Sequence, residues 1–190
     1  GWSLKEAIVR LGRKKVGAIA QQIKMMNSLV KPEASMFDLR RFWEHSVGCA
    51  MIADRLYSNG IVKTRKPVQF NDYWIGALLH DIGKIVLGFF FWDHYEQILR
   101  QMAESQLSFR QAEKALGDAA NHEYLGRLLL VKSNVGKELA KAVGSHNSVG
   151  NAPSDLVCLM HVANNVSKEL DLGYMVEEEP NYSPEVLKAL

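Results

Sequence analysis

The stretch Ile75-Gly76-Ala77-Leu78-Leu79-His80-Asp81-Ile82-Gly83-Lys84 decides how the rest of the chain is interpreted. Its apolar first half leads directly into an adjacent histidine and aspartate, so both polar side chains follow a buried segment. An imidazole nitrogen and a carboxylate oxygen held side by side can bind one divalent metal, and the carboxylate can bridge two ions. Gly83 would let the backbone turn tightly, and Lys84 would contact a phosphate group. The stretch therefore predicts a metal centre beside a phosphate-binding lysine.

Length and composition indicate a single globular domain. The chain has 190 residues, of which 47% are hydrophobic, and this is enough to bury a core. A net charge of +2 gives no reason to expect nucleic acid as a partner. The longest apolar run, residues 85–92, is much shorter than the roughly 20 residues that cross a bilayer, so we expect no membrane association.

The two cysteines indicate a reducing compartment. Cys49 and Cys158 lie far apart in the sequence, each within an apolar helical pattern, so we expect buried free thiols rather than a disulfide. The first residues alternate apolar and charged side chains and do not resemble a signal peptide. These features predict a cytoplasmic protein.

Apolar residues recur at helical spacing along most of the chain, and no segment shows the alternation of a strand. The fold class is therefore predicted to be all-α, a compact multi-helix bundle. A buried apolar segment is expected over residues 85–91, and Ser108 is expected to cap a helix. The expected helices cover residues 4–29, 37–58, 71–80, 93–105, 108–116, 121–132, 136–144 and 154–170, with a short terminal helix from Ser183-Pro184.

Four of the six histidines lie where a predicted helix crosses or leaves the core. They are His45, His80, His122 and His146. Together with Asp81 they supply four imidazoles and one carboxylate that can converge on one cavity, as metal ligands do in helix bundles. His94 lies among polar residues and is interpreted as a surface residue. His161 lies in an apolar stripe and is interpreted as a packed, hydrogen-bonded core residue rather than a ligand.

The order of these residues resembles the HD superfamily of metal-dependent phosphohydrolases, and most closely its HDOD branch. The matching stretches are residues 37–46, 76–84, 121–126 and 160–164. The similarity extends from about residue 4 to residue 170 and implies an HD-domain-like helical bundle. HDOD proteins usually carry further residues upstream. Residues 1–30 would then be a helix leading from a missing N-terminal HDOD subdomain, and residues 31–190 would form the HD-like domain.

The resemblance implies that His45, His80 and Asp81 hold one divalent metal, which could be Fe, Mn, Mg or Zn. A further acidic residue normally completes this ligand set from a late helix, and the present chain has Asn164 there. The neutral carbonyl oxygen of an asparagine is a weaker ligand than a carboxylate and cannot act as a base.

The same resemblance implies a second ion in some relatives. His122 and His146 would hold it, with Asp81 as the bridge between the two ions. Relatives with two metals have a pair of adjacent histidines at the later position, whereas here His146 is followed by Asn147. The centre is therefore expected to bind one ion, or none, rather than a full pair.

If the chain is active, Asp81 and Lys84 are its expected catalytic residues. The metal would lower the pKa of a water molecule to about 7, and Lys84 would neutralise a phosphate oxygen. Substrates of the superfamily are phosphomonoesters and phosphodiesters, including nucleotides and cyclic dinucleotides. Because Asn164 and Asn147 replace stronger ligands, the favoured interpretation is an HDOD signalling module with weak or no hydrolysis.

Two alternatives stay open. One is a working metal-dependent phosphohydrolase, and the other is a plain helical interaction domain whose histidines only pack in the core. The HDOD resemblance implies bacterial signal transduction, with protein partners and a small ligand that carries phosphate. Tyr73, Trp74 and the aromatic residues 89–92 are expected to pack in the core. The alternative is that they face the missing N-terminal half or form a contact in a homodimer.

Overall fold

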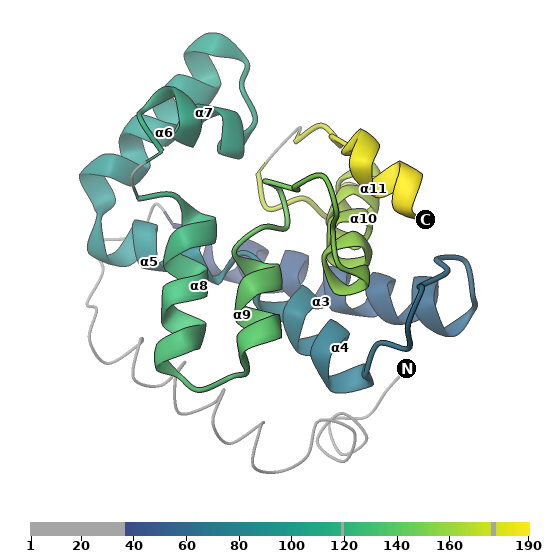
Figure 1. The fold of residues 1–190 in the computed structure, drawn as a ribbon. Helices are drawn as coiled ribbons and strands as arrows, with labels where there is room; N and C mark the ends of the chain where they lie inside the picture. Colours follow the sequence, from purple (N-terminus) through teal and green to yellow (C-terminus); the bar gives the residue numbers. More distant parts are fainter. Residues whose placement is uncertain (1–36, 119, 176–177) are drawn as a thin grey trace. The chain divides into compact units, whose positions relative to one another are not determined.

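The computed structural model describes residues 37–118, 120–175 and 178–190, and every regular element within them is a helix (Figure 1). The predicted all-α fold class is therefore confirmed. The helix expected over residues 4–29 lies outside the described residues. Asp38–Leu190 form one compact unit, and the predicted division after residue 30 stays a prediction. The helices are α3 (Leu39–Ser58), α4 (Phe70–Leu79), α5 (Ile82–Phe90), α6 (Trp92–Ser105), α7 (Phe109–Ala115), α8 (His122–Lys132), α9 (Lys137–Val143), α10 (Asp155–Glu169) and α11 (Pro184–Ala189).

Side-chain caps fix where two of these helices begin. Ser108 caps α7 as expected, and with Gln111 it forms a reciprocal capping box. Asn121 caps α8, because its side-chain oxygen accepts a hydrogen bond of 2.8 Å from the backbone N–H of Tyr124. Since α8 then begins at His122, this cap also sets the position of a candidate metal ligand.

A short break separates α4 from α5 at His80-Asp81. The backbone of Asp81 leaves the helical region at φ −98° and ψ 9°, and its carbonyl accepts a 2.8 Å hydrogen bond from the N–H of Lys84. The chain thus changes direction at the two polar residues, so both side chains lie where α4 ends and α5 begins. This junction places them at the centre of the bundle, where both are at most 1% exposed.

Gly83 is needed for a close approach between helices rather than for a tight turn. A Cβ atom at this position would collide with the carbonyl oxygen of His122 and would lie 2.9 Å from the nitrogen of Gly126. The residue is not among those with a positive φ. The expectation of a turn glycine was therefore wrong: Gly83 lets α5 pack directly on the backbone of α8, one of the closest helix pairs of the bundle.

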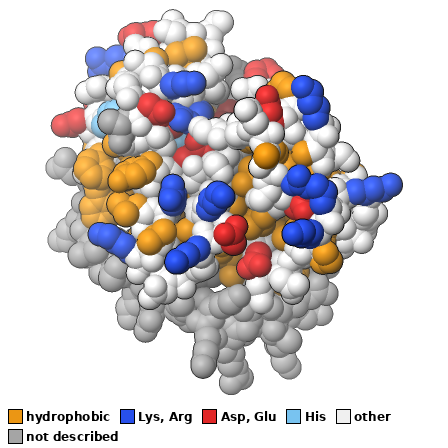
Figure 2. Space-filling view, viewed as in Figure 1, with side chains coloured by type: hydrophobic (Ala, Val, Ile, Leu, Met, Phe, Trp, Pro, Cys, Tyr) orange, Lys and Arg blue, Asp and Glu red, His pale blue; other side chains and the backbone are white. Residues whose placement is uncertain are grey.

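The core lies around α10, which packs against α3, α4 and α9. The apolar residues of α5 are only partly in this core. Leu87 is fully buried, but Phe90 is 49% exposed and Phe91, just after the helix, is 50% exposed. The expectation of a fully buried segment was wrong here, because a helix on the rim turns only one face to the core. Figure 2 shows hydrophobic side chains gathered on the side where Figure 1 draws the junction of α5 and α6.

One stretch of the described residues, Phe70–Phe90, is long and apolar enough to pass a composition test for a membrane-spanning helix. In the structure it is divided between α4 and α5, and 78% of the tested window is buried inside the protein. A core segment of a globular domain passes the same test.

Candidate metal centre

The structure brings four histidines around Asp81. His45 comes from α3, His80 from the junction of α4 and α5, His122 from the first position of α8, and His146 from the loop between α9 and α10. All five side chains are at most 1% exposed. Residues separated by a hundred positions in the sequence thus meet at one buried carboxylate.

The carboxylate of Asp81 lies between two pairs of imidazoles. Its Oδ2 atom is 3.4 Å from Nε2 of His45 and 3.4 Å from Nε2 of His80, and those two nitrogens are 3.2 Å apart. Its Oδ1 atom is 3.4 Å from Nε2 of His122 and 3.3 Å from Nε2 of His146. Ligand atoms of a tetrahedral ion with bonds of about 2.1 Å lie about 3.4 Å apart. Both pairs therefore have the spacing of a metal ligand set, with Asp81 as the bridge.

Each of the four imidazoles is oriented by an acceptor at Nδ1. When Nδ1 carries the proton and donates it to such an acceptor, Nε2 carries a lone pair, and here every Nε2 is directed towards Asp81. Three of the acceptors are backbone carbonyls and one is a carboxylate. The pairs are His45 with Leu172 at 2.9 Å, His80 with Ala77 at 2.7 Å, His146 with Val143 at 2.8 Å, and His122 with Glu113 at 2.7 Å.

Glu113 is a functional residue that the sequence interpretation missed. Besides the imidazole, its carboxylate accepts a 2.6 Å hydrogen bond from the backbone N–H of His122. The side chain is 1% exposed. Glu113 therefore fixes both the backbone and the ring of His122. The available signal was a glutamate on the apolar face of a short helix, a position that a charged residue occupies only when it is paired.

Glu123 is a second missed residue, and it holds the loop that carries His146. Its Oε1 atom accepts hydrogen bonds from the backbone N–H groups of Asn147 at 2.7 Å and Ser148 at 3.0 Å. Arg110 donates to the other oxygen of Glu123 at 3.1 Å. Burial raises the pKa of Glu123, but the neighbouring imidazoles and the hydrogen bonds from Ser148 and Asn147 lower it below its usual value. The loop is thus tied to α8 by an ionised carboxylate.

His161 behaves as predicted for a core residue. It is 2% exposed, its Nδ1 donates to the carbonyl of His146 at 2.7 Å, and its Nε2 accepts from the backbone N–H of Ser183 at 2.9 Å. Both ring nitrogens are therefore used in holding backbone. His94 lies on α6 and is partly buried.

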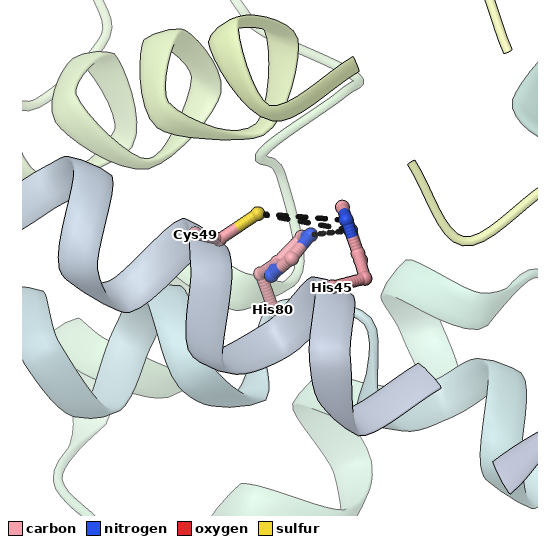
Figure 3. Close-up of side chains that lie close together, drawn as sticks. All are labelled: His45, Cys49 and His80. Atoms are coloured by element: carbon pink, nitrogen blue, oxygen red, sulfur yellow. Dashed lines mark hydrogen bonds between the residues drawn. The ribbon is translucent and has the colours of Figure 1, made fainter. Parts of the chain in front are cut away.

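Cys49 lies one helical turn after His45, and Figure 3 shows it beside His45 and His80. Its Sγ atom is 3.7 Å from Nδ1 and 3.7 Å from Nε2 of His45, and it donates to Oγ of Ser167 at 3.3 Å. An atom equally distant from both ring nitrogens lies off the direction of the Nε2 lone pair. The thiol therefore packs beside the imidazole. The third candidate metal ligand beside His45 and His80 is the carboxylate of Asp81. Both cysteines are free and buried, as predicted.

Asn147 covers the second pair of imidazoles. Its side-chain Nδ2 lies 2.8 Å from Nε2 of His146 and 3.2 Å from Nε2 of His122. The amide therefore donates hydrogen bonds to the two lone pairs that a second ion would use. The first pair, His45 and His80, has no amide in the corresponding place among the described residues.

Asn164 lies on α10 and is 2% exposed. Its Nδ2 makes one long contact, 3.5 Å, with Oδ1 of Asn147. Within the described part of the chain, Oδ1 of Asn164 and Oδ1 of Asp81 are buried acceptors that receive no hydrogen bond. An unsatisfied buried acceptor is costly, and a cation removes that cost. Unpaired oxygens among oriented imidazoles therefore fit a divalent metal.

Burial and neighbouring groups shift the pKa values of several side chains at the centre. Burial lowers the pKa of His80 to about 4, which keeps this ring neutral, as a ligand must be. Burial also lowers the pKa of His45, but Cys49 and Asp81 outweigh burial and raise this pKa to about 10, so His45 must release a proton when an ion binds. Although burial raises it, the charge of Lys84 and hydrogen bonds from the neighbouring imidazoles hold the pKa of Asp81 well below its usual range. A cation at this centre would meet an ionised carboxylate.

Lys84 is directed at Asp81 rather than at open space. Its Nζ donates to Oδ2 of Asp81 at 2.7 Å, and the side chain is 4% exposed. It also lines a cavity of about 70 Å³ beside the centre, here called the inner cavity, whose wall includes His122, Asn147 and Asn164. Sites for drug-sized ligands are about 300–1,000 Å³. The inner cavity can hold water or a small ion but not a nucleotide.

Comparison with known proteins agrees with this fold. An HDOD protein of unknown function from Geobacter sulfurreducens has a TM-score of 0.63 at 22% identity, over 75% of this chain and 47% of its own. A protein from Shewanella amazonensis SB2B named "Putative phosphohydrolase" has a TM-score of 0.66 at 19% identity, over 90% of this chain and 61% of its own. The chain thus spans about half to three fifths of these two structures. At such identities the likeness establishes the fold.

Among curated proteins, no relative matches the chain. The family model of the HDOD domain matches residues 2–149, which is most of the chain and includes all five residues of the histidine–aspartate cluster. The chain belongs to the HDOD domain family.

Proposed function

We propose that this chain is an HDOD signal-transduction module that binds one divalent metal ion and has weak or no hydrolytic activity. The ion would lie between His45, His80 and Asp81. The observation that carries the proposal is the matching spacing of these three donors, 3.2 to 3.4 Å, together with the Nδ1 hydrogen bonds that direct both rings. An iron, manganese or zinc ion suits imidazoles with one carboxylate.

Two features support binding in preference to catalysis. By the HDOD resemblance, Asn164 replaces the carboxylate that completes the ligand set in relatives. Asn147 donates hydrogen bonds to the second pair of imidazoles. A metal that activates water needs an open position beside it. Each of the three proposed ligands is at most 1% exposed. None of them lines the inner cavity, and only His45 lines a surface hollow, of about 290 Å³. A centre of this kind is suited to holding a conformation that partner proteins recognise in the cytoplasm.

Metal content tests the metal part of the proposal. The protein, purified without chelator or added metal, is analysed by inductively coupled plasma mass spectrometry beside Asp81→Ala and an exposed control, Asp93→Ala. We expect about one equivalent of transition metal in the wild type and in the control, and almost none in Asp81→Ala, because a bridging carboxylate is lost. Equal metal in all three proteins would contradict the proposal.

A working phosphohydrolase is the second candidate. It is favoured by the position of Asp81 between two pairs of imidazoles and by Lys84. The Lys84 ammonium, which donates to Asp81, could instead donate to a phosphate oxygen of a substrate. The test is hydrolysis of p-nitrophenyl phosphate and of its diester by the metal-loaded protein. Turnover that Asp81→Ala abolishes would establish this candidate and would overturn the proposal of weak or no hydrolysis. Turnover gained only in Asn164→Asp would support the proposal.

A further inference from the structure

The ion pair of Lys168 and Glu178 lies between two hollows. Lys168 belongs to α10, and Glu178 lies in the segment before α11. Both side chains line the inner cavity, and both also line an outer hollow of about 450 Å³ whose wall includes Arg41 and Glu179. The pair is therefore a shared wall between the metal centre's cavity and a hollow large enough for a small ligand.

This ion pair is buried but incompletely satisfied. Nζ of Lys168 lies 2.8 Å from Oε1 of Glu178, and the two side chains are 8% and 4% exposed. The second oxygen, Oε2 of Glu178, is buried and accepts no hydrogen bond from the described residues. Removing two charges from water is expensive, and an unpaired oxygen adds to that cost. Stability alone gives little reason for this arrangement, because apolar residues would fill the same space at lower cost.

The position of the Glu178 carboxylate strongly favours negative charge. Although burial raises it, Lys84 and Lys168 lower the pKa of Glu178 to about 2. Asn164 lines the same inner cavity, and its amide nitrogen makes only one 3.5 Å contact, so it can donate to an incoming anion. Two lysines and an amide donor thus line the same cavity as a buried carboxylate, and such groups bind phosphate oxygens.

We propose that Lys168 is the binding residue of an oxyanion subsite, that Glu178 fills this subsite as an internal anion, and that a phosphate group displaces Glu178 on entering from the outer hollow. The ligand class is a phosphate group with three or more acceptor oxygens, which would engage Lys168 and Asn164 more fully than one carboxylate oxygen does. The signalling use of the subsite rests on the proposed function, but phosphate binding itself needs no metal ion.

The test is isothermal titration of inorganic phosphate into the wild type, Glu178→Gln and Glu179→Gln at constant ionic strength. Glu179 is the matched control, because it is exposed and lines only the outer hollow. We expect phosphate to bind Glu178→Gln at least about tenfold more tightly than the wild type, since the internal competitor is gone, and Glu179→Gln to resemble the wild type. Adding Lys168→Met to Glu178→Gln should abolish the gain. A second arm with AMP distinguishes a free phosphate ion from a phosphate group on a nucleoside.

Each outcome decides the proposal. A gain in Glu178→Gln that is no larger than in Glu179→Gln would overturn it, and so would a gain that survives Lys168→Met, which would mean an adventitious ion only. If a metal ion bound the phosphate, the affinity for phosphate would be the same in Glu178→Gln and Glu179→Gln. Failure of this proposal can therefore be told apart from failure of the metal proposal. If Glu178→Gln is too unstable to titrate, phosphate should raise its melting temperature more than that of Glu179→Gln. Absence of that difference would equally overturn the proposal.

Discussion

At the scale of single residues, Asn147 is the side chain that, under the proposed function, would limit the centre to one ion. Its amide donates to the nitrogens of His122 and His146 that are otherwise placed as ligands. Asn147→His removes this cover and supplies another imidazole, so we expect metal content to rise from about one to about two equivalents per chain. Mass spectrometry of the purified variant measures this. Asn151→His, in an exposed part of the same loop, is the control for adventitious binding by an added histidine. Equal metal in both variants would show that Asn147 does not limit the centre.

Glu178 predicts a pH dependence of stability. Its pKa in the folded chain is about 2, below the ordinary value of 4.5, so the ionised carboxylate stabilises the fold above pH 4.5. That contribution is lost as the pH falls from 4.5 towards 2, because in this range the unfolded chain binds a proton at this carboxylate while the folded chain does not. Urea unfolding should therefore show a difference between the wild type and Glu178→Gln that is larger at pH 6 than at pH 3. A difference independent of pH would mean that Glu178 is not held as a carboxylate.

At the scale of elements, the contact between α5 and α8 depends on Gly83. A methyl group there would press on the carbonyl of His122, the first residue of α8. We expect Gly83→Ala to lower the free energy of unfolding by about 1–3 kcal/mol and to reduce metal content, because α5 carries Asp81 at its start. Gly150→Ala, where a Cβ meets open space, is the control in the same urea-unfolding experiment. Unchanged stability in Gly83→Ala would contradict the close approach of the two helices.

The elements were also the part most accessible from sequence. Helical spacing located α3, α4, α8 and α10 to within a residue or two at either end, and the cap predicted at Ser108 located the beginning of α7. The pairing of Glu113 with His122 was not predictable, since it depends on how α7 packs against α8. The same holds for the exposure of Phe90, because periodicity shows which side chains are apolar but not which face of a rim helix is covered.

At the scale of the whole molecule, a bound ion would join α3 to the junction of α4 and α5. His45 and His80 are far apart in the sequence, so an ion between them stabilises only the folded chain. At a metal concentration of 100 times Kd this contributes about 2.7 kcal/mol, and each kcal/mol shifts Tm by about 2–4 °C. We expect a chelator to lower the Tm of the wild type by roughly 5 to 10 °C. Differential scanning calorimetry with Asp81→Ala as control checks this, since a chelator effect of equal size in that variant would exclude the centre as its cause.

The backbone hydrogen bonds of the histidines bear on how such a protein can change over generations. Three of the four imidazoles are directed by main-chain carbonyls, which every amino acid possesses. Substitutions at those carbonyl-bearing positions leave the acceptors in place as long as the helices keep their course. A change of residue at position 164 or 147 can therefore alter the donors around the centre without reorienting these three imidazoles. The orientation of the rings is thus less sensitive to substitution than the set of groups beside them.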